Sequence, residues 1–300
     1  MLQSGERAQL IAAARLYYED NLTQAQVAQK LGISRPSVSK MLTKAREVGI
    51  VRIEICAGAE GDADLLEQLQ LRYGLLGGCV LPADKNLWQQ IARYLVAETS
   101  YDSNLGLGWG YVLGEICSVL GTFPIQPQNG SIYPLVGTAH FPHRGYHPDD
   151  LVKTWAEATG RSCIPLNCPA FPDSAEDRDR LESTGSFSKL QSLWQQLDAA
   201  IVHLKGFPSV PDQATATRFG DALKQQKAVG SFLSYYYNER GEFISGNNDF
   251  CIHVPLAQLR HCRKIIAIGT NTTDKAILGA LATGLITNLI VNEEQARRLL

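Results

Sequence analysis

Short polar side chains alternate with cations between Ser34 and Lys44. On one face of a helix, arginine and lysine can meet phosphates and guanine edges, and hydroxyl groups can reach bases or the DNA backbone. The residues suited to this chemistry are Thr23, Gln24, Ser34, Arg35, Ser37, Ser39, Lys40 and Lys44. The pattern predicts a surface that contacts the major groove of double-stranded DNA.

Two short helices would position these side chains. Thr23 is a good N-cap for the first, and Gly32 stands where a left-handed residue ends it, with Ile33 filling the corner. Ser34 caps the second helix, whose apolar residues fall on one buried face. A helix over 9–19 and an alternating strand over 50–55 complete a winged helix-turn-helix. The alternative is an ordinary helical hairpin with a solvated polar face.

Three glycine-containing stretches follow apolar runs in the rest of the chain: GLGWGYV at 106–112, PLVGT at 134–138 and IGTNTTDKAI at 268–277. Exposed N–H groups where a strand leads into a helix favour an anion or a sugar hydroxyl. Lys275 falls in the first turn of a helix, where the dipole disfavours a cation unless it meets an anion. It is therefore a candidate ligand for a phosphate or an acidic sugar. A solvated lysine, and glycines that serve only close packing, are the alternatives.

Strand and helix patterns alternate from residue 64 onward. The expected strands cover 78–81, 104–108, 132–136, 199–204, 265–268 and 289–291, and the expected helices cover 64–73, 87–99, 149–159, 188–197, 214–225, 274–283 and 293–300. This alternation predicts an α/β fold with a mostly parallel sheet, helices on both faces and ligands beyond the carboxyl ends of the strands. A small, charged stretch at 57–62 divides the predicted domains, 1–56 and 57–300.

The charge distribution agrees with DNA binding at one end of the chain. The net charge of the 300 residues is −2, but residues 1–55 hold eight Lys and Arg against five Asp and Glu. The sequence has no signal-peptide core and no apolar run near the roughly 18 residues that span a bilayer. Its seven cysteines are scattered without zinc-site spacing. These features indicate a cytoplasmic protein with no membrane partner.

The chain resembles the SorC family of bacterial sugar-responsive transcriptional regulators over nearly its whole length. The resemblance lies in residues 16–51, GLGWGYVL, YPLVGT, 197–202, 229–244 and the closing stretch from KIIAIGTNTTDKAI onward. It implies a Rossmann-like effector domain related to sugar-phosphate isomerases but not catalytic. It also implies a homodimer or tetramer, a sugar or sugar-phosphate effector that tunes operator affinity, and no cofactor. By position, the effector residues would be Gly108, Trp109, Gly110, Tyr111, Gly137, Thr138, Asn238, Gly269, Thr270 and Lys275.

The chain departs from the family pattern at several of these places. Val112 stands where many members have a phosphate-binding threonine, and Ser231 stands where members often have aspartate. Thr270 stands where members of the family often have a second glycine. The usual Gly-x-Gly after the strand at 199–204 is replaced by His203-Leu204-Lys205-Gly206. We therefore expect a sugar-type effector and leave its phosphorylation state open.

Two further interpretations stay open. His140, His143 and His147, followed by two aspartates, could ligate a metal, but Pro and Gly make this a loop whose histidines are better suited to sugar hydroxyls or to the surface. An isomerase- or deaminase-like enzyme with an accessory N-terminal domain is the alternative to a repressor or other regulator. It is disfavoured because no acid–base pair is evident at the strand ends.

Overall fold

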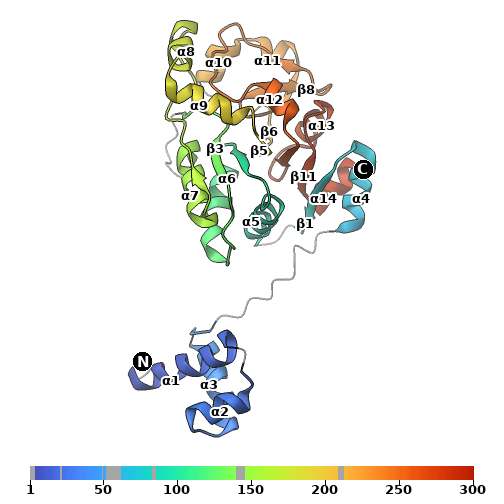
Figure 1. Cartoon of the computed structure of the whole chain (residues 1–300). Helices are drawn as coiled ribbons and strands as arrows, with labels where there is room; N and C mark the ends of the chain where they lie inside the picture. The colour runs from blue at the N-terminus through green and yellow to red at the C-terminus, as the bar shows by residue number, and fades with distance from the viewer. Residues whose placement is uncertain are drawn as a thin grey trace. The chain divides into compact units, whose positions relative to one another are not determined.

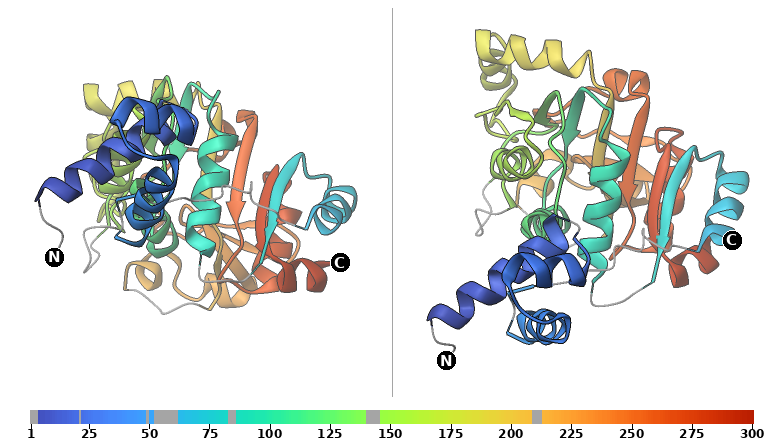
Figure 2. Two further views of the ribbon diagram at one scale, coloured as in Figure 1. Left: turned by 90° about the horizontal axis from the view of Figure 1, so that it is seen from below. Right: turned by 60° about the horizontal axis from the view of Figure 1, so that its bottom comes forward.

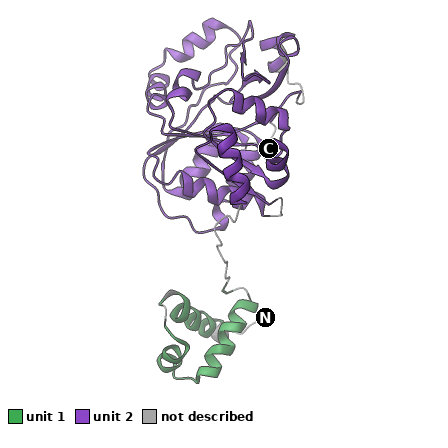
Figure 3. Cartoon of the chain, turned by 90° about the vertical axis from the view of Figure 1, so that its right-hand side faces the viewer, with its two compact units in different colours: residues 1–58 green, residues 59–300 purple. Residues whose placement is uncertain are grey.

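The computed structural model describes residues 4–20, 22–48, 50–51, 62–82, 86–139, 146–208 and 213–300. The chain divides into two compact units, residues 1–58 and residues 59–300, coloured separately in Figure 3. The predicted boundary between residues 56 and 57 and most of the predicted wing strand lie outside the described residues. No described helix is both long and apolar enough to cross a bilayer.

Three helices and a π-helical turn form the N-terminal unit. They are α1 (Ser4–Ala14), the π turn η1 (Arg15–Glu19), α2 (Gln24–Leu31) and α3 (Arg35–Glu47). Their buried core holds Ala13, Val27, Ala28, Val38 and Leu42, with Leu16 and Met41 packed against it. The apolar faces predicted for the two helices are confirmed. One detail is wrong: Ile33 is 37% exposed and does not fill the corner between them.

The caps that fix the turn between α2 and α3 are those that the sequence predicts. The Thr23 hydroxyl accepts from the Gln26 N–H while the Gln26 side chain accepts from the Thr23 N–H, a capping box that satisfies two helix-end donors. Gly32 ends α2 in the left-handed conformation, φ 67°. Ser34 accepts from the Ser37 N–H at the start of α3. These local bonds fix the point at which the exposed face of α3 begins.

A seven-stranded sheet in which every pair is parallel forms the centre of the second unit (Figure 1). In order across the sheet, its strands are β1 (Gly77–Leu81), β11 (Asn288–Asn292), β10 (Lys264–Ile268), β5 (Ala199–His203), β2 (Asn104–Leu107), β3 (Ser131–Pro134) and β4 (Ser162–Cys163). The predicted α/β class and parallel sheet are confirmed. The strands alternate in side-chain direction, so each face of the sheet builds its own apolar core.

Helices cover both faces of this sheet. One core is built with α4 (Ala63–Tyr73), α9 (Gly185–Trp194), α12 (Leu256–His261), α13 (Asp274–Ala282) and α14 (Glu293–Leu299), and the other with α5 (Leu87–Glu98), α6 (Tyr111–Ser118) and α7 (Pro148–Thr159). Figure 2 shows α4 beside the edge strand β1. Helix α8 (Ala175–Glu182) precedes α9. The helices α8 and α12 have no counterpart in the sequence expectations.

A small antiparallel sheet extends the molecule beyond the carboxyl end of β5. Its strands are β6 (Lys205–Gly206), β7 (Ala228–Phe232), β8 (Tyr235–Asn238) and β9 (Phe243–Ile244). The strand at Tyr235 and the turn after it were expected, but the sheet as a whole was not. The single helix expected over 214–225 is wrong: α10 (Gln213–Phe219) and α11 (Ala222–Gln225) are separated at Gly220, where φ is 52°.

Tyr237 fastens this small sheet to α13. Its side chain is fully buried, and its hydroxyl donates to the Ala276 carbonyl at 2.9 Å. Replacing Tyr237 with Phe removes this buried hydrogen bond, so we expect the free energy of unfolding to fall by about 1 kcal/mol. Urea unfolding measures the loss. Tyr101→Phe is the control because Tyr101 is 98% exposed. Equal stability of the two variants would contradict the anchoring role.

Candidate functional site: a cavity beyond the strand ends

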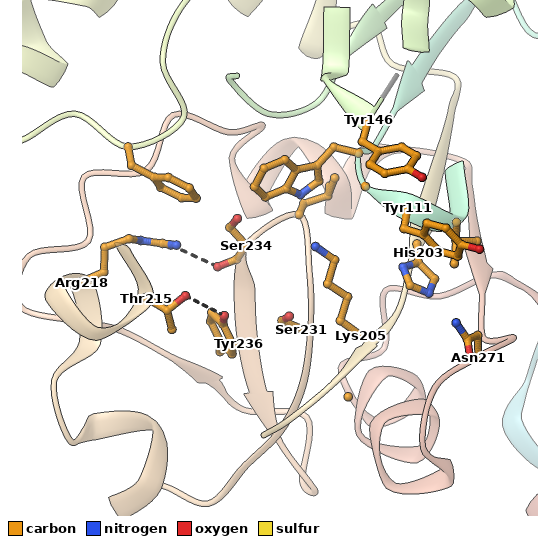
Figure 4. Close-up of a pocket in the computed structure, with 16 residues that line it drawn as sticks. Tyr111, Tyr146, His203, Lys205, Thr215, Arg218, Ser231, Ser234, Tyr236 and Asn271 are labelled. Atoms are coloured by element: carbon orange, nitrogen blue, oxygen red, sulfur yellow. Dashed lines mark hydrogen bonds between the residues drawn. The ribbon is translucent and has the colours of Figure 1, made fainter. Parts of the chain in front are cut away.

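A cavity of about 600 Å³ lies where β2 and β5 end. Most of its lining comes from the start of α6, the segment running from β5 into β6, the strands β7 and β8 with the turn between them, and α10, and three residues from other loops complete it (Figure 4). The lining residues are Trp109, Gly110, Tyr111, Val112, Tyr146, Phe171, His203, Lys205, Gly206, Thr215, Arg218, Ser231, Leu233, Ser234, Tyr236 and Asn271. The volume falls within the range of small-molecule sites.

Cations and aromatic rings alternate along one wall of the cavity. The Lys205 ammonium lies 4.8 Å from the centre of the Trp109 ring, and Trp109 lies 6.0 Å from Phe171. The Arg218 guanidinium carbon lies 4.7 Å from the centre of the Phe171 ring. Each cation faces the negative face of a ring, an attraction that strengthens as water is excluded. Apolar ring faces of this kind also suit the C–H face of a sugar.

The N-terminus of α6 opens into the cavity. Gly110 precedes the helix with φ 106° and has no side chain that could cap it. A β-carbon placed on Gly110 would lie 3.6 Å from the Lys205 ammonium, in ordinary contact. The positive end of the α6 dipole and a lysine ammonium therefore meet at one place. A helix N-terminus and an ammonium group each favour negatively charged or oxygen-rich groups nearby.

Arg218 is held in a fixed orientation. Its side chain is 5% exposed; Nε and Nη2 donate to Asp249 Oδ1 at 2.9 and 2.7 Å, and Nη2 also donates to the Ser234 carbonyl at 3.2 Å. Phe171 and Phe219 each lie within 5 Å of the guanidinium carbon. The ion pair ties α10 to the segment at residue 249 and fixes one wall of the cavity.

Several buried polar atoms beside the cavity have no hydrogen-bond partner within the described part of the chain. They include both ring nitrogens of His203 and the hydroxyl oxygens of Thr270 and Thr272. Burial, assisted by the Lys205 charge, lowers the pKa of His203 to about 4, although the Thr270 backbone opposes the shift. His203 is therefore neutral at pH 7, with one ring N–H to donate and one nitrogen to accept.

The structure brings only some of the predicted effector residues to the cavity. Trp109, Gly110 and Tyr111 line it, and Gly108 directly precedes them. The predicted residues that do not line it are Gly137, Thr138, Asn238, Gly269, Thr270 and Lys275. Four residues that the family comparison marks as departures do line it: Val112, His203, Lys205 and Ser231.

Two of the outlying residues are engaged elsewhere. Lys275 is 74% exposed, and its ammonium pairs with Glu239 Oε1 at 2.7 Å, a bond that raises the pKa of Lys275 and lowers that of Glu239. The anion that the helix-dipole argument required is thus a side chain of the protein. Asn238 Oδ1 accepts from the N–H groups of Arg240 and Glu242, closing the turn after β8. Their roles as effector ligands remain predictions.

Sequence reasoning did not predict eight of the residues that line the cavity. These are Tyr146, Phe171, Thr215, Arg218, Leu233, Ser234, Tyr236 and Asn271. Asn271 carried a signal in the sequence, because it follows an apolar strand and asparagine is enriched among the non-glycine residues that adopt a positive φ. In the structure its φ is 63°. Arg218 and Phe171 carried none, since neither belongs to a motif and their approach depends on the folded chain.

The predicted DNA-contacting face belongs to the N-terminal unit. Arg35, Ser39, Lys40 and Lys44 are exposed along α3, whereas Ser37 is half-buried and shares a hydrogen bond with the Ser34 hydroxyl. Thr23 is exposed, and Gln24 is half-buried.

Among the described residues, no group of three or more His, Cys, Asp or Glu could hold a metal. His140 and His143 lie outside the described residues.

Comparison with known proteins defines the class of this molecule. Residues 58–300 match the family model described as "Putative sugar-binding domain", and residues 14–48 match a model of sigma-70 region 4. The chain is 28% identical to the sorbitol operon regulator of Klebsiella pneumoniae, covering 97% of both chains, and 30% identical to the deoxyribonucleoside regulator of Bacillus subtilis, covering 98% of both. A helix-turn-helix unit is thus joined to a sugar-binding α/β unit, as in transcriptional regulators.

The crystal structure of the full-length sorbitol operon regulator of Klebsiella pneumoniae has the same fold as this chain. It superposes with a TM-score of 0.82, at 26% identity and with 99% of each chain covered. The chain belongs to the SorC family of sugar-responsive transcriptional regulators. The resemblance inferred from the sequence is confirmed.

The buried state of His203 gives a test by pH. Its pKa in an unfolded chain is about 6.5, so lowering the pH from 6.5 toward 4 protonates the unfolded state first and destabilises the fold. When the pH is lowered from 6.5 to 4.5, the free energy of unfolding of the wild type should fall by about 2 kcal/mol more than that of His203→Gln. Urea unfolding at both pH values measures this. The assignment fails if His203→Gln shows the same pH dependence as the wild type.

Proposed function

We propose that α3 contacts operator DNA and that a sugar or sugar phosphate in the cavity changes the affinity for that DNA. The observation that carries the proposal is the cavity itself, which joins aromatic faces, hydroxyls and two cations in a chain that also has a helix-turn-helix unit. Relatives named for a sorbitol operon and for deoxyribonucleosides indicate polyols, sugars and their derivatives as the effector class.

The exposed face of α3 supports DNA contact through charge and geometry. Arg35 is at the first position of the helix. Lys40 and Lys44 lie further along it, and about one helical turn separates these two lysines from each other. The N-terminal residues of a recognition helix are those that reach base edges, whereas cations further along meet phosphates. In this arrangement Arg35 reads a base, and Lys40 and Lys44 bind the DNA backbone.

The cavity suits binding better than catalysis. No Asp or Glu is among its described lining residues, and sugar-phosphate isomerisation requires a general base in contact with the substrate. His203 is neutral, and its lowered pKa makes it a weak base. These features support a sensor and not an isomerase- or deaminase-like enzyme.

The protein would act as a homodimer, assembling further to a tetramer, in the cytoplasm. A single helix-turn-helix addresses one half-site, and a symmetric pair addresses two, which raises both affinity and specificity. An effector that prefers one arrangement of the assembly shifts DNA affinity by the ratio of its affinities for the two arrangements.

A combined binding assay tests the proposal. Fluorescence anisotropy with DNA from the region flanking the protein's own gene would be measured with and without a panel of sugars, sugar alcohols, sugar acids and their phosphates. We expect at least one compound to change the DNA affinity fivefold or more and to raise the melting temperature, since binding to the folded state stabilises it. No response to any compound would overturn the effector role, and failure to bind any fragment would overturn the DNA role.

Arg35 gives the sharpest test of the DNA-binding face. Arg35→Ala should weaken operator binding by roughly 1–3 kcal/mol and relax the preference at one base position. Exposed Lys189→Ala in the second unit is the control for a general loss of positive charge. Unchanged operator affinity in Arg35→Ala would refute the assignment.

A further inference from the structure

The loop between β10 and α13 contributes Asn271 to the lining of the cavity. Asn271 adopts φ 63°, a conformation that is uncommon outside glycine. The hydroxyl oxygens of Thr270 and Thr272, on either side of it, are buried and have no hydrogen-bond partner among the described residues. Buried hydroxyls without partners cost free energy, so a ligand that contacts this loop and offers them partners favours its rearrangement.

Gln295 of α14 holds the other side of this loop. Its side chain is buried, and its Nε2 donates to the carbonyls of Gly269 and Thr272 at 2.9 and 3.3 Å. Its Oε1 accepts from the Asn292 N–H at 3.3 Å, which closes the capping box at the start of α14. One buried amide thus bonds two carbonyls of the loop and the first turn of the helix. A shift of the loop therefore requires a shift of α14 or the loss of these bonds.

A second contact joins the end of the loop to the same helix. Arg298 of α14 donates from Nε and Nη2 to the two carboxylate oxygens of Asp274, the first residue of α13, at 2.6 and 3.0 Å. A bidentate pair of this kind fixes orientation as well as distance. Both side chains are partly exposed, so the pair contributes more to geometry than to stability. The loop and the start of α13 are thus bound to α14 at two places.

Helix α4 holds the other end of α14. The last carbonyl groups of a helix have no partner within the helix. Side chains of α4 supply two donors here, since the Arg72 guanidinium donates to the Leu300 carbonyl and the Tyr73 hydroxyl donates to the Leu299 carbonyl. Leu69 of α4 and Leu299 belong to the same buried apolar core, and the two helices lie side by side (Figure 1). Hydrogen bonds and apolar packing together couple α4 to α14.

Helix α4 is also where the chain arrives from the helix-turn-helix unit. It is the first helix of the second unit, which begins at residue 59, and Asp62 is its N-cap. Asp62 Oδ1 accepts from the Leu65 N–H at 3.0 Å, and Oδ2 lies 3.9 Å from Arg297 Nη2 of α14. A displacement of α14 therefore acts on both ends of α4, and at Asp62 on the segment that leads to the DNA-binding unit.

We propose that α14 transmits the state of the cavity to the helix-turn-helix unit, and that Gln295 is the positioning residue that couples the loop at 269–272 to this helix. The inference rests on the proposed function and adds its route. The route runs from the loop through Gln295 to α14, and from α14 through Arg72 and Tyr73 to α4. Gln295 acts through the backbone of the loop and does not itself line the cavity.

The quantity that this route controls is the coupling factor, the ratio of the DNA dissociation constants measured with and without effector. Sorbitol, sorbitol 6-phosphate, deoxyribose and deoxyribose 5-phosphate would be the first probes, and the compound with the largest coupling factor, from these or from the wider panel, would be used for every variant. Fluorescence anisotropy with the full chain measures the coupling factor. Isothermal titration measures the affinity for the same compound without DNA, which a residue of the route leaves unchanged.

A double variant of α4 tests the contact far from the cavity. Arg72→Met with Tyr73→Phe removes both donors to the carbonyls at the end of α14. We expect a coupling factor of fivefold or more in the wild type to fall below twofold, while the affinity for the compound without DNA changes less than twofold, because neither residue lines the cavity. Arg180→Met with Tyr101→Phe makes the same changes at exposed positions and is the matched control. An unchanged coupling factor in the α4 variant overturns the inference.

Gln295→Met tests the contact at the loop. Methionine has a similar size and helix propensity but cannot donate to the two carbonyls, so the coupling factor should again fall below twofold. If each change alone removes most of the coupling, their effects cannot add, as expected for a single route. Gln191→Met, at an exposed position of α9, is the control. Partial losses that add in the combined variant would refute the shared route.

The measurements also separate a structural role of Gln295 from a role in coupling. Weaker binding of the compound without DNA, with the coupling factor intact, would mean that Gln295 only supports the cavity wall, and this result overturns its assignment. If Gln295→Met does not fold, the α4 variant decides the inference.

The outcomes distinguish this inference from the proposed function. A wild-type protein that responds to an effector, with full coupling in every variant, overturns only the inference. A wild-type protein whose DNA affinity responds to no compound overturns the proposed effector function, and the inference with it.

Discussion

The pairing of β2 with β5 is the constraint on which the cavity depends. Leu105 pairs with Ala199 and Leu107 with Ile201, and at this pair the order of strands in the sheet changes direction. The chain runs outward from β2 through β3 to β4, returns to β5 and then continues through β10 to β11 on the other side. Loops that leave two neighbouring parallel strands at such a point diverge and open a crevice between them. The crevice here lies between the start of α6 and Lys205.

The small antiparallel sheet closes that crevice from the far side. β6 follows β5 after a single residue, so the large sheet sets the position of Lys205. Ser231, which pairs with Lys205, is positioned by β7 of the small sheet. The buried pair of Arg218 with Asp249 then fixes α10 against this wall. A buried ion pair contributes little net stability because both groups lose water, so its presence is better explained by the orientation it gives to Arg218.

The parts of this structure that were predictable from the sequence are those specified by local interactions. Thr23, Gly32 and Ser34 define the helix-turn-helix because each cap bonds within three or four residues of itself. The alternation of strands and helices defines the parallel sheet, and GLGWGYV marks the start of α6 at the cavity. Arg218, Phe171 and Tyr146 were beyond prediction because segments distant in sequence bring them together. Lys275 illustrates the same limit: the dipole argument correctly required an anion, but that anion is Glu239, on the turn that follows β8.

The departures from the family pattern form a consistent set once the register of the small sheet is known. Lys205 and Ser231, which depart independently in the sequence, are cross-strand partners. An aspartate at residue 231, which the family resemblance leads one to expect, would lie directly opposite this lysine. Serine places a neutral hydroxyl opposite Lys205, and Val112 places an apolar side chain at the start of α6. A lysine ammonium is a point charge that tolerates many ligand geometries, so selection by geometry requires a more rigid group. Among the described lining residues, Arg218 is such a group, because Asp249 fixes its guanidinium and the rings of Phe171 and Phe219 each lie within 5 Å of it.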